Sequence, residues 1–479
     1  MSTVLWESLS AWWPELILSL GALKVILAGV WFKSPRGALT FAWLFVAAAA
    51  AALWVAPVPP STDVFFGLIV CDPFSLVFRW LALGSVAITL LLMSASRELP
   101  LSLRGEGMGL LLAIGVGLML MAEANHLLMA YLAMELVSLS AYLLVGFLRD
   151  ARSSEAALKY LLFGALASGI MLFGMSLLFA LTGQLSFPAL LEAVRGLSGP
   201  MASALLVAVS LMLAGLAFKI SMVPFHMWTP DAYEGAPAAV TALLSVGPKA
   251  AGLALFLRIM AALAPAWPAL APTVLGLTVL TMTLGNVVAL VQTNVKRLLA
   301  YSTIGQVGYL LIGVVAHTAL GHEALLLYLV AYLFMNFGAF ACVVAVVNET
   351  GSESLEAFRG LSKRAPALAL SLALFLLSLA GIPPLLGFFG KFLLFQSALD
   401  ASQAWLAIAG AVNSAVALYY YANLIRLMYF VPSESARPVR PAAALHVALG
   451  LCAAATLLLG LFPGALLEWL SAHASLNLL

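Results

Sequence analysis

Residues 213–228 read LAGLAFKISMVPFHMW, an apolar stretch that contains one lysine and is interrupted by one proline. With the apolar residues before it, the stretch is long enough for a membrane helix, which needs about 20 mostly apolar residues. Lys219 lies inside this run, where an ionisable group costs about 2.5–3.5 kcal/mol on insertion scales. Pro224 follows it and removes a backbone hydrogen bond. The stretch therefore predicts a membrane helix that is broken beside a buried charge.

The composition of the whole chain supports a membrane protein. Of its 479 residues, 64% are hydrophobic and 9% are charged, whereas soluble proteins carry about 25% charged residues. The mean hydropathy is +1.10. Such a chain cannot cover a globule with polar surface, which excludes a soluble enzyme, a nucleic-acid-binding protein and a disordered scaffold. Cys71, Cys342 and Cys452 lie far apart, which argues against a disulfide framework or an all-cysteine iron–sulfur site.

Apolar runs between polar breaks predict an all-α polytopic protein with about fourteen membrane helices. The connections between them leave no room for a soluble domain. The first run has no basic residue before Lys24, so we expect a retained helix rather than a signal peptide. The predicted spans are 16–32, 38–55, 73–93, 107–122, 126–148, 156–181, 203–228, 237–263, 268–292, 301–317, 323–348, 366–398, 404–430 and 441–463.

The distribution of positive charge predicts the orientation, because cytoplasmic loops are enriched in Lys and Arg. With the N-terminus outside, Arg195 is the one positive residue in the outer loops. Both termini, and therefore Ser2 and Leu479, should then face the periplasm, with loops 149–159 and 349–365 in the cytoplasm. The inner loops hold Lys33, Arg36, Arg97, Arg104, Arg149, Arg152, Lys159, Lys296, Arg297, Arg359, Lys363, Arg364, Arg426, Arg437 and Arg440.

Four ionisable residues lie too deep in predicted spans to reach water. They are Glu135, Lys219, Lys249 and Lys391. Together they cost on the order of 10–14 kcal/mol on insertion, and such residues mark functional sites by default. One alternative is a structural ion pair between Glu135 and Lys219, but one acid cannot neutralise three lysines. A row of buried groups whose protonation states depend on one another meets the physical requirement for moving charge through a membrane.

Other charges near span ends have a simpler interpretation. Arg79 and Arg258 lie within two turns of a predicted end, so we expect their long side chains to reach the headgroups. Lys24 lies nine residues before Lys33, and for Lys24 both interpretations stay open.

A second predicted break lies in the twelfth span, where Gly381, Pro383 and Pro384 precede Lys391. Broken helices at corresponding positions of two halves are typical of transporters. Helices 4–8 and 9–13 then form two five-helix units, each with its fourth helix broken. Because five is odd, the second unit enters from the opposite side, so the repeats are inverted. We expect helices 1–3 in 1–106, the first repeat in 107–263, the second in 264–430 and helix 14 in 431–479.

The histidines give no sign of a haem. Five of the six are at helix ends, in loops or in the tail, and the sixth, His446, is about two turns inside its run. No pair faces across mid-membrane, which argues against bis-histidine haem. His226 follows the first break, where it could relay protons or cap a polar junction, and the residues do not decide between the two.

The stretch 223–237, VPFHMWTPDAYEGAP, resembles the hallmark of the antiporter-like membrane subunits of respiratory complex I, the proton-pumping NADH:quinone oxidoreductase. Within that group it is most similar to the N subunit, the counterpart of mitochondrial subunit 2. The segments MELVSLSAYLL (134–144), NVKRLLAYSTIGQVGYLL (294–311) and GIPPLLGFFGKF (381–392) agree with it. The resemblance covers nearly the whole chain.

This resemblance implies fourteen helices, two inverted repeats and a chain of buried charges along the central plane of the membrane. By residue-for-residue match, it implies that Glu135, Lys219, Lys249 and Lys391 carry proton translocation. A glutamate in place of Lys391 would suggest the M-type subunit instead. The resemblance assigns no role to His226.

The expected function is that of a proton-translocating membrane-arm subunit, driven by quinone reduction elsewhere in the complex. It implies no cofactor or metal on this chain, with NADH, FMN, iron–sulfur clusters and quinone in partner subunits. M-type and K-type subunits and the lipid bilayer are the expected partners, and the inner membrane of a bacterium is the expected location. The alternative is a subunit of an Mrp-type Na⁺/H⁺ antiporter, and a third possibility is a scaffold with inert ion pairs.

Overall fold

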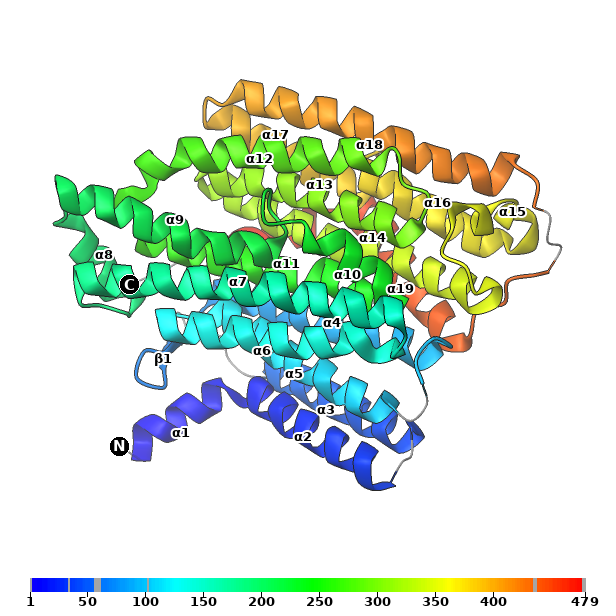
Figure 1. Cartoon of the computed structure of the whole chain (residues 1–479), viewed down its shortest axis with the longest axis horizontal. Coiled ribbons are helices and arrows are strands. Elements are labelled where there is room, and N and C mark those ends of the chain that lie inside the picture. The colour runs from blue at the N-terminus through cyan, green and yellow to red at the C-terminus, as the bar shows by residue number, and fades with distance from the viewer. Residues whose placement is uncertain (1, 33–34, 56–61, 101–102, 434–436, 476–479) are drawn as a thin grey trace.

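The computed structural model describes every residue except 1, 33–34, 56–61, 101–102, 434–436 and 476–479. Its described part is almost wholly helical, with long helices packed side by side (Figure 1). The long helices are α2 (Trp13–Phe32), α3 (Pro35–Val55), α4 (Pro73–Ala95), α5 (Arg104–Glu123), α6 (Leu127–Val145), α7 (Ala151–Thr182), α9 (Pro200–Ile220), α11 (Ala238–Ala262), α12 (Trp267–Ala289), α13 (Val295–Ala316), α14 (Ala319–Thr350), α18 (Ala404–Phe430) and α19 (Ala443–Leu461).

Shorter elements complete the described part of the chain. Two strands form an antiparallel hairpin between α3 and α4. The short elements are α1 (Ser2–Ala11), β1 (Thr62–Val64), β2 (Ile69–Cys71), η2 (Gly146–Leu148), α8 (Phe187–Arg195), α10 (Trp228–Gly235), η3 (Ala264–Ala266), η4 (Leu355–Phe358), α15 (Leu361–Arg364), α16 (Pro366–Ala380), α17 (Leu386–Asp400) and α20 (Gly464–His473).

The number of membrane crossings agrees with the sequence. Thirteen of the described helices are long and apolar enough to span a membrane. The remaining predicted span, 366–398, is divided between α16 and α17. These elements together provide the fourteen predicted crossings and confirm the predicted fold class.

Two helices begin five or six residues earlier than predicted. The side chain of Asp150 accepts a hydrogen bond from the backbone N–H of Ser153, so α7 begins at Ala151 rather than at 156. The side chain of Asn294 likewise accepts from the N–H groups of Lys296 and Arg297 at the start of α13. Such N-caps satisfy amides that the first turn leaves unpaired. Most of the predicted loop 149–159 is therefore helical.

Both predicted breaks are present. Ser221 follows the end of α9 and Gly381 follows the end of α16, each in the left-handed conformation, with φ of 65° and 90°. Each ending is followed by a cis X–Pro bond and then by a second helical segment, α10 or α17. The carbonyls in the last turn before each break have no partner further along the helix and remain available to side chains.

The two halves repeat the same backbone plan. Helices α7 and α14 both have 32 residues, and each is followed by a glycine with a φ of 65°, Gly183 or Gly351. After each glycine the chain forms an isolated bridge back to the start of the preceding helix pair, His126 with Ser186 and Asn294 with Ser354. Five membrane-crossing helices lie between the equivalent residues His126 and Asn294. Because five is odd, the second repeat is inverted relative to the first.

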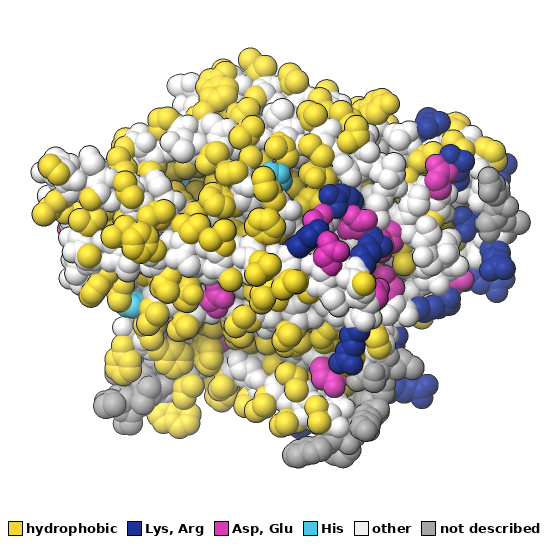
Figure 2. All heavy atoms as spheres, viewed as in Figure 1, with side chains coloured by type: hydrophobic (Ala, Val, Ile, Leu, Met, Phe, Trp, Pro, Cys, Tyr) yellow, Lys and Arg dark blue, Asp and Glu magenta, His cyan; other side chains and the backbone are white. Residues whose placement is uncertain are grey.

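Charged side chains gather at one end of the helices. In Figure 2 they lie over α10 and around α15, while most of the rest of this face is apolar. We call this end, where α10 and α15 lie, the charged end. Helix α1 lies at the opposite end (Figure 1).

Candidate functional site: a row of buried charges across both halves

Glu135 and Lys219 each form a hydrogen bond with a serine hydroxyl. Ser168 on α7 donates a hydrogen bond to the carboxylate of Glu135 on α6. The Lys219 Nζ donates to Ser138 Oγ at 2.9 Å. Glu135 and Ser138 are three residues apart and therefore lie on the same face of α6. Within the described residues, no ion pair joins Glu135 to Lys219 directly, so the structural ion pair considered as an alternative is not formed.

Lys249 lies on an aromatic platform rather than beside an acid. Its side chain is fully buried in α11, and its Nζ has no hydrogen-bond partner among the described residues. The Nζ lies 4.6 Å from the ring centroid of Trp228 and 5.2 Å from that of Tyr233. Aromatic faces attract an ammonium, more strongly when it is desolvated.

The first helix break builds this platform. Trp228 and Tyr233 belong to α10, the segment after the break. The indole of Trp228 donates to the carbonyl of Phe218 at 3.1 Å, which ties α10 back onto α9. Tyr160 stacks on the indole at 4.1 Å between ring centroids and 5° between planes. The motif WTPDAYEG thus positions the surroundings of Lys249.

Neutral polar side chains connect α11, the helix that carries Lys249, to the second half. Ser245 lies one turn before Lys249 on α11, and its Oγ accepts a hydrogen bond from Asn336 Nδ2 on α14 at 2.6 Å. The same Nδ2 lies 3.2 Å from Tyr332 Oη. Tyr332 donates to Thr303 Oγ1 on α13 at 2.9 Å. The connection therefore runs from α11 through α14 to α13.

Lys391 completes the row at the second break. It is 3% exposed, and its Nζ donates to the carbonyl of Leu379 at 2.9 Å. Gln306 Nε2, one turn after Thr303 on α13, donates to the same carbonyl at 3.1 Å. The ammonium also lies 4.2 Å from the ring centroid of Tyr309. Carbonyls freed by the end of α16 therefore bind Lys391, and none of the ion pairs among the described residues involves it.

The prediction for two arginines was wrong. Arg79 is 6% exposed and forms ion pairs with Glu15 and Glu123. Arg258 is fully buried, and its Nη2 lies 2.7 Å from Asp72 Oδ1. Neither side chain reaches a surface, because acids on other helices bind them inside the protein.

The two residues left open on the sequence lie in different surroundings. His226 is 8% exposed, and its Nδ1 has no hydrogen-bond partner among the described residues. Lys24 is exposed on α2, with its Nζ 4.9 Å from the ring centroid of Phe41.

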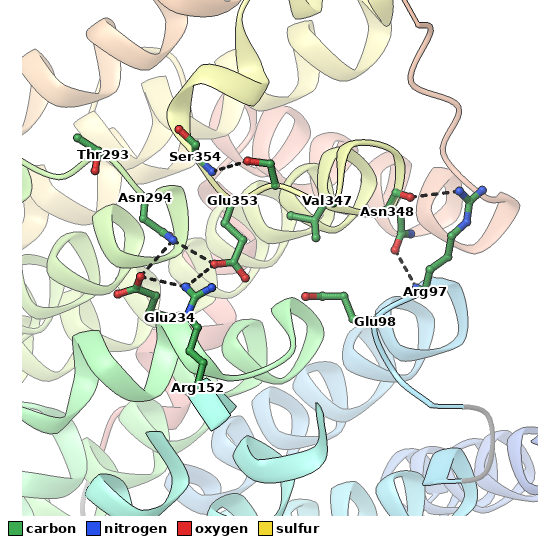
Figure 3. Close-up of a pocket in the computed structure, with 12 residues that line it drawn as sticks. Arg97, Glu98, Arg152, Glu234, Thr293, Asn294, Val347, Asn348, Glu353 and Ser354 are labelled. Carbon is green, nitrogen blue, oxygen red and sulfur yellow. Dashed lines mark hydrogen bonds and ion pairs between the residues drawn. The ribbon is translucent and has the colours of Figure 1, made fainter. Parts of the chain in front are cut away.

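A polar cavity at the charged end lies between the two halves. It has a volume of about 710 Å³, and Arg152, Glu234 and Glu353 line it (Figure 3). Arg152 on α7 bridges Glu234 at 2.9 Å and Glu353 at 2.7 Å. Burial alone would raise the pKa of Glu353, but its contacts with Lys296, Asn294 and Arg152 together outweigh burial and lower that pKa.

The sequence interpretation missed the hydroxyl and amide groups of this row. Ser168, Asn336 and Tyr332 carry no charge, so their presence in an apolar run gives no energetic signal of the kind that a lysine gives. Their spacing holds some information, because Tyr332 and Asn336 are four residues apart and therefore share a helix face.

The broken helices and the row of buried charges define an antiporter-like subunit of a polytopic membrane assembly. Residues 124–417 match the family described as "NADH:quinone oxidoreductase/Mrp antiporter, TM". NADH-quinone oxidoreductase subunit N of Anaeromyxobacter sp. is 42% identical, over 98% of this chain and 97% of that protein. NAD(P)H-quinone oxidoreductase subunit 2 of Microcystis aeruginosa is 41% identical, over 87% and 82%. The chain belongs to the family of N subunits of NADH-quinone oxidoreductase.

Solved structures agree with this assignment. A chain of respiratory complex I from Thermus thermophilus has a TM-score of 0.82 and 34% identity, over 95% of this chain and 98% of that one. A chain of the Mrp complex from Dietzia sp. has a TM-score of 0.86 but 23% identity, over 97% of both, which is a likeness of fold alone. The expected function, a proton-translocating membrane-arm subunit with other membrane-arm subunits as neighbours, is confirmed, and the Mrp alternative is distant.

Proposed function

We propose that protons move through this chain along Glu135, Lys219, Lys249 and Lys391, driven by quinone reduction in partner subunits. The observation that carries this proposal is the succession of buried charged and neutral polar groups across both halves. They extend from Glu135 on α6 to Lys391 on α17 as short hydrogen-bonded segments, with Lys249 between two of them. Because these groups are buried, a change in the charge of one is weakly screened and alters the proton affinity of the next.

In this mechanism the members of the row have different roles. Glu135 stabilises an ammonium at Lys219 through the shared face of α6. Lys249 holds a proton on the aromatic platform, with no acid against its Nζ among the described residues. Tyr332 and Asn336 offer a hydrogen-bonded connection that can pass a proton or an electrostatic change onward to Lys391. A role for His226 as a relay stays a prediction.

We further propose that this chain is a non-redox translocase subunit. NADH, FMN, iron–sulfur clusters and quinone would belong to partner subunits. Among the described residues, no group of three or more His, Cys, Asp or Glu side chains is arranged to hold a metal ion. The assignment of the two repeats to 107–263 and 264–430 is part of the same proposal.

The proposed location is the inner membrane of a bacterium, with both termini in the periplasm. Support comes from the asymmetry of positive charge, since the charged end would face the cytoplasm. Cysteine labelling at Ser2 and Leu479 tests this orientation, and the three native cysteines are buried and give little background. Labelling of either position from the cytoplasmic side alone would overturn the topology.

The function itself is tested by substituting Lys249 in the assembled complex. We expect Lys249→Ala to lower quinone-coupled proton pumping in proteoliposomes on the order of tenfold, which corresponds to about 1.4 kcal/mol. Arg195→Ala, which removes an exposed ion pair on α8, is the matched control and should pump normally. Normal turnover and an unchanged proton-to-electron ratio in the Lys249→Ala complex would favour the scaffold with inert ion pairs.

Co-purification separates the proposal from the antiporter alternative. Flavin-containing and iron–sulfur subunits bound to this chain support the oxidoreductase. Small membrane subunits alone would indicate an Mrp-type assembly.

A further inference from the structure

A second group of buried charges lies outside the proposed row. It joins Glu15 on α2, Arg79 on α4 and Glu123 on α5, close to Ala11 at the end of α1. The side chains of both glutamates are fully buried, and that of Arg79 is 8% exposed. The group therefore sits at the end of the helices opposite to the charged end.

Each of the two glutamates has one buried oxygen that receives no hydrogen bond. Arg79 Nε donates to Glu123 Oε1, and Arg79 Nη2 donates to Glu15 Oε2 at 3.1 Å. Arg79 Nε also lies 2.8 Å from Glu15 Oε1, but a guanidinium Nε carries one hydrogen. Glu15 Oε1 and Glu123 Oε2 therefore have no hydrogen-bond partner among the described residues. The arrangement lacks a hydrogen for these two carboxylate oxygens.

The charges of the group do not balance. Two carboxylates and one guanidinium leave one surplus negative charge among buried side chains, and such a charge is costly unless it is paired or neutralised. The adjacent thiol of Cys71, 3.2 Å from Arg79 Nη2, does not change this sum. Burial, and then the nearby Glu123, raise the pKa of Cys71, so that it stays a neutral thiol.

The neighbouring charges do not supply the missing positive charge. Asp72 follows Cys71 in the chain, and its carboxylate is paired with Arg258, both fully buried. That pair is neutral by itself. One proton held between two carboxylates would remove the surplus charge and also provide the missing hydrogen.

We propose that Glu15, Glu123 and Arg79 form a proton-binding site, in which the two carboxylates share one proton that is released and regained during turnover. The release and uptake of this proton during turnover rests on the proposed function, proton translocation through this chain. The site would be the protonatable station nearest to α1, and therefore the one facing the periplasm in the proposed orientation.

The test uses the intact complex and infrared difference spectroscopy under turnover, which detects the C=O stretch of a protonated carboxyl group. We expect a turnover-dependent carboxyl signal that both Glu15→Gln and Glu123→Gln remove. The matched control is Asp63→Asn, because it removes an exposed carboxylate on β1, outside the buried group. That variant should keep the signal. In proteoliposomes, both Gln variants should also lower the proton-to-electron ratio.

Three results would overturn the proposal. One is absence of the signal from the wild-type complex, which needs no variant to be stable. Another is persistence of the signal in either Gln variant that assembles, and the third is its loss in Asp63→Asn. Normal pumping after substitution of Lys219 and Lys249 would instead refute the proposed function. The Glu15→Gln and Glu123→Gln variants would still decide whether these two carboxyl groups give the infrared signal.

Discussion

The two five-helix halves share one backbone plan but fill it with different chemistry. Where α6 carries Glu135, the corresponding position of α13, 168 residues later, is Thr303. Where α9 carries Lys219 two residues before its left-handed end, α16 carries Leu379. The Leu379 carbonyl nevertheless binds an ammonium, that of Lys391, which arrives from the segment after the break.

The difference separates two tasks. The first half holds an acid and two lysines close enough to influence one another, so it can store and shift charge. The second half surrounds one lysine with hydroxyl, amide and carbonyl groups, which can transmit a proton without keeping it. Both halves place an ammonium beside the end of a half-helix, because the break leaves polar backbone there.

The largest effect should come from breaking the acid–base pair of the first half. We expect Glu135→Ala and Lys219→Ala each to reduce quinone-coupled pumping about tenfold or more in complexes that still assemble, and the double variant to be no worse than the more severe single variant. Proton-to-electron ratios and turnover in proteoliposomes measure this. If the losses in the double variant multiply, the two residues act independently.

The next effect distinguishes the lone lysine of the second half from a fixed counter-ion. A methionine at position 391 keeps most of the apolar stem but cannot hold a proton, and an arginine keeps the charge but stays protonated, with a pKa above about 12. If Lys391 gains and loses a proton, both variants should lose pumping to a similar degree. A fully coupled Lys391→Arg complex would make it a counter-ion.

A smaller effect should follow from weakening the neutral connection between the halves. Tyr332→Phe removes only the hydroxyl that donates to Thr303, and the loss of one hydrogen bond is worth about 1 kcal/mol. We expect pumping to slow by a few fold. Tyr419→Phe on the exposed face of α18 is the control, and equal rates in the two variants would exclude this connection from the path.

The smallest effect concerns the ion pairs that join the halves at the charged end. The lowered pKa of Glu353 means that its pairing stabilises the fold above the ordinary value of 4.5 and loses that contribution as the pH falls through the lowered pKa. Glu353→Gln should cost about 1 kcal/mol at neutral pH after allowance for solvent screening. Melting curves of the purified complex should show the two proteins converge in acid, and a gap that widens in acid would contradict this.

The sequence predicted those parts of the molecule whose residues strongly change the free energy of membrane insertion or of helix formation. Apolar length revealed the spans, prolines revealed both breaks, and charge within a span revealed Lys219 and Lys391. The partners of Arg79 and Arg258 were missed because depth within a run says nothing about a neighbour such as Glu123, 44 residues away. The sequence did hold a signal for these ion pairs, because Glu15 and Glu123 lie near the ends of other spans on the same side of the membrane as Arg79. Uncharged members of the row, such as Asn336, are tolerated in membrane helices and cannot be recognised singly.

The inverted repeat also has a consequence for the ancestry of the gene. If the two halves arose by duplication, copies of one five-helix unit had to insert into the bilayer in both directions. A unit that does so must carry little bias in its loop charges, since Lys and Arg set the direction of insertion. In the present sequence Arg195 is the one positive residue in the predicted outer loops. On this history the asymmetry of loop charge arose after the two copies had fused, when each half inserted in one fixed direction.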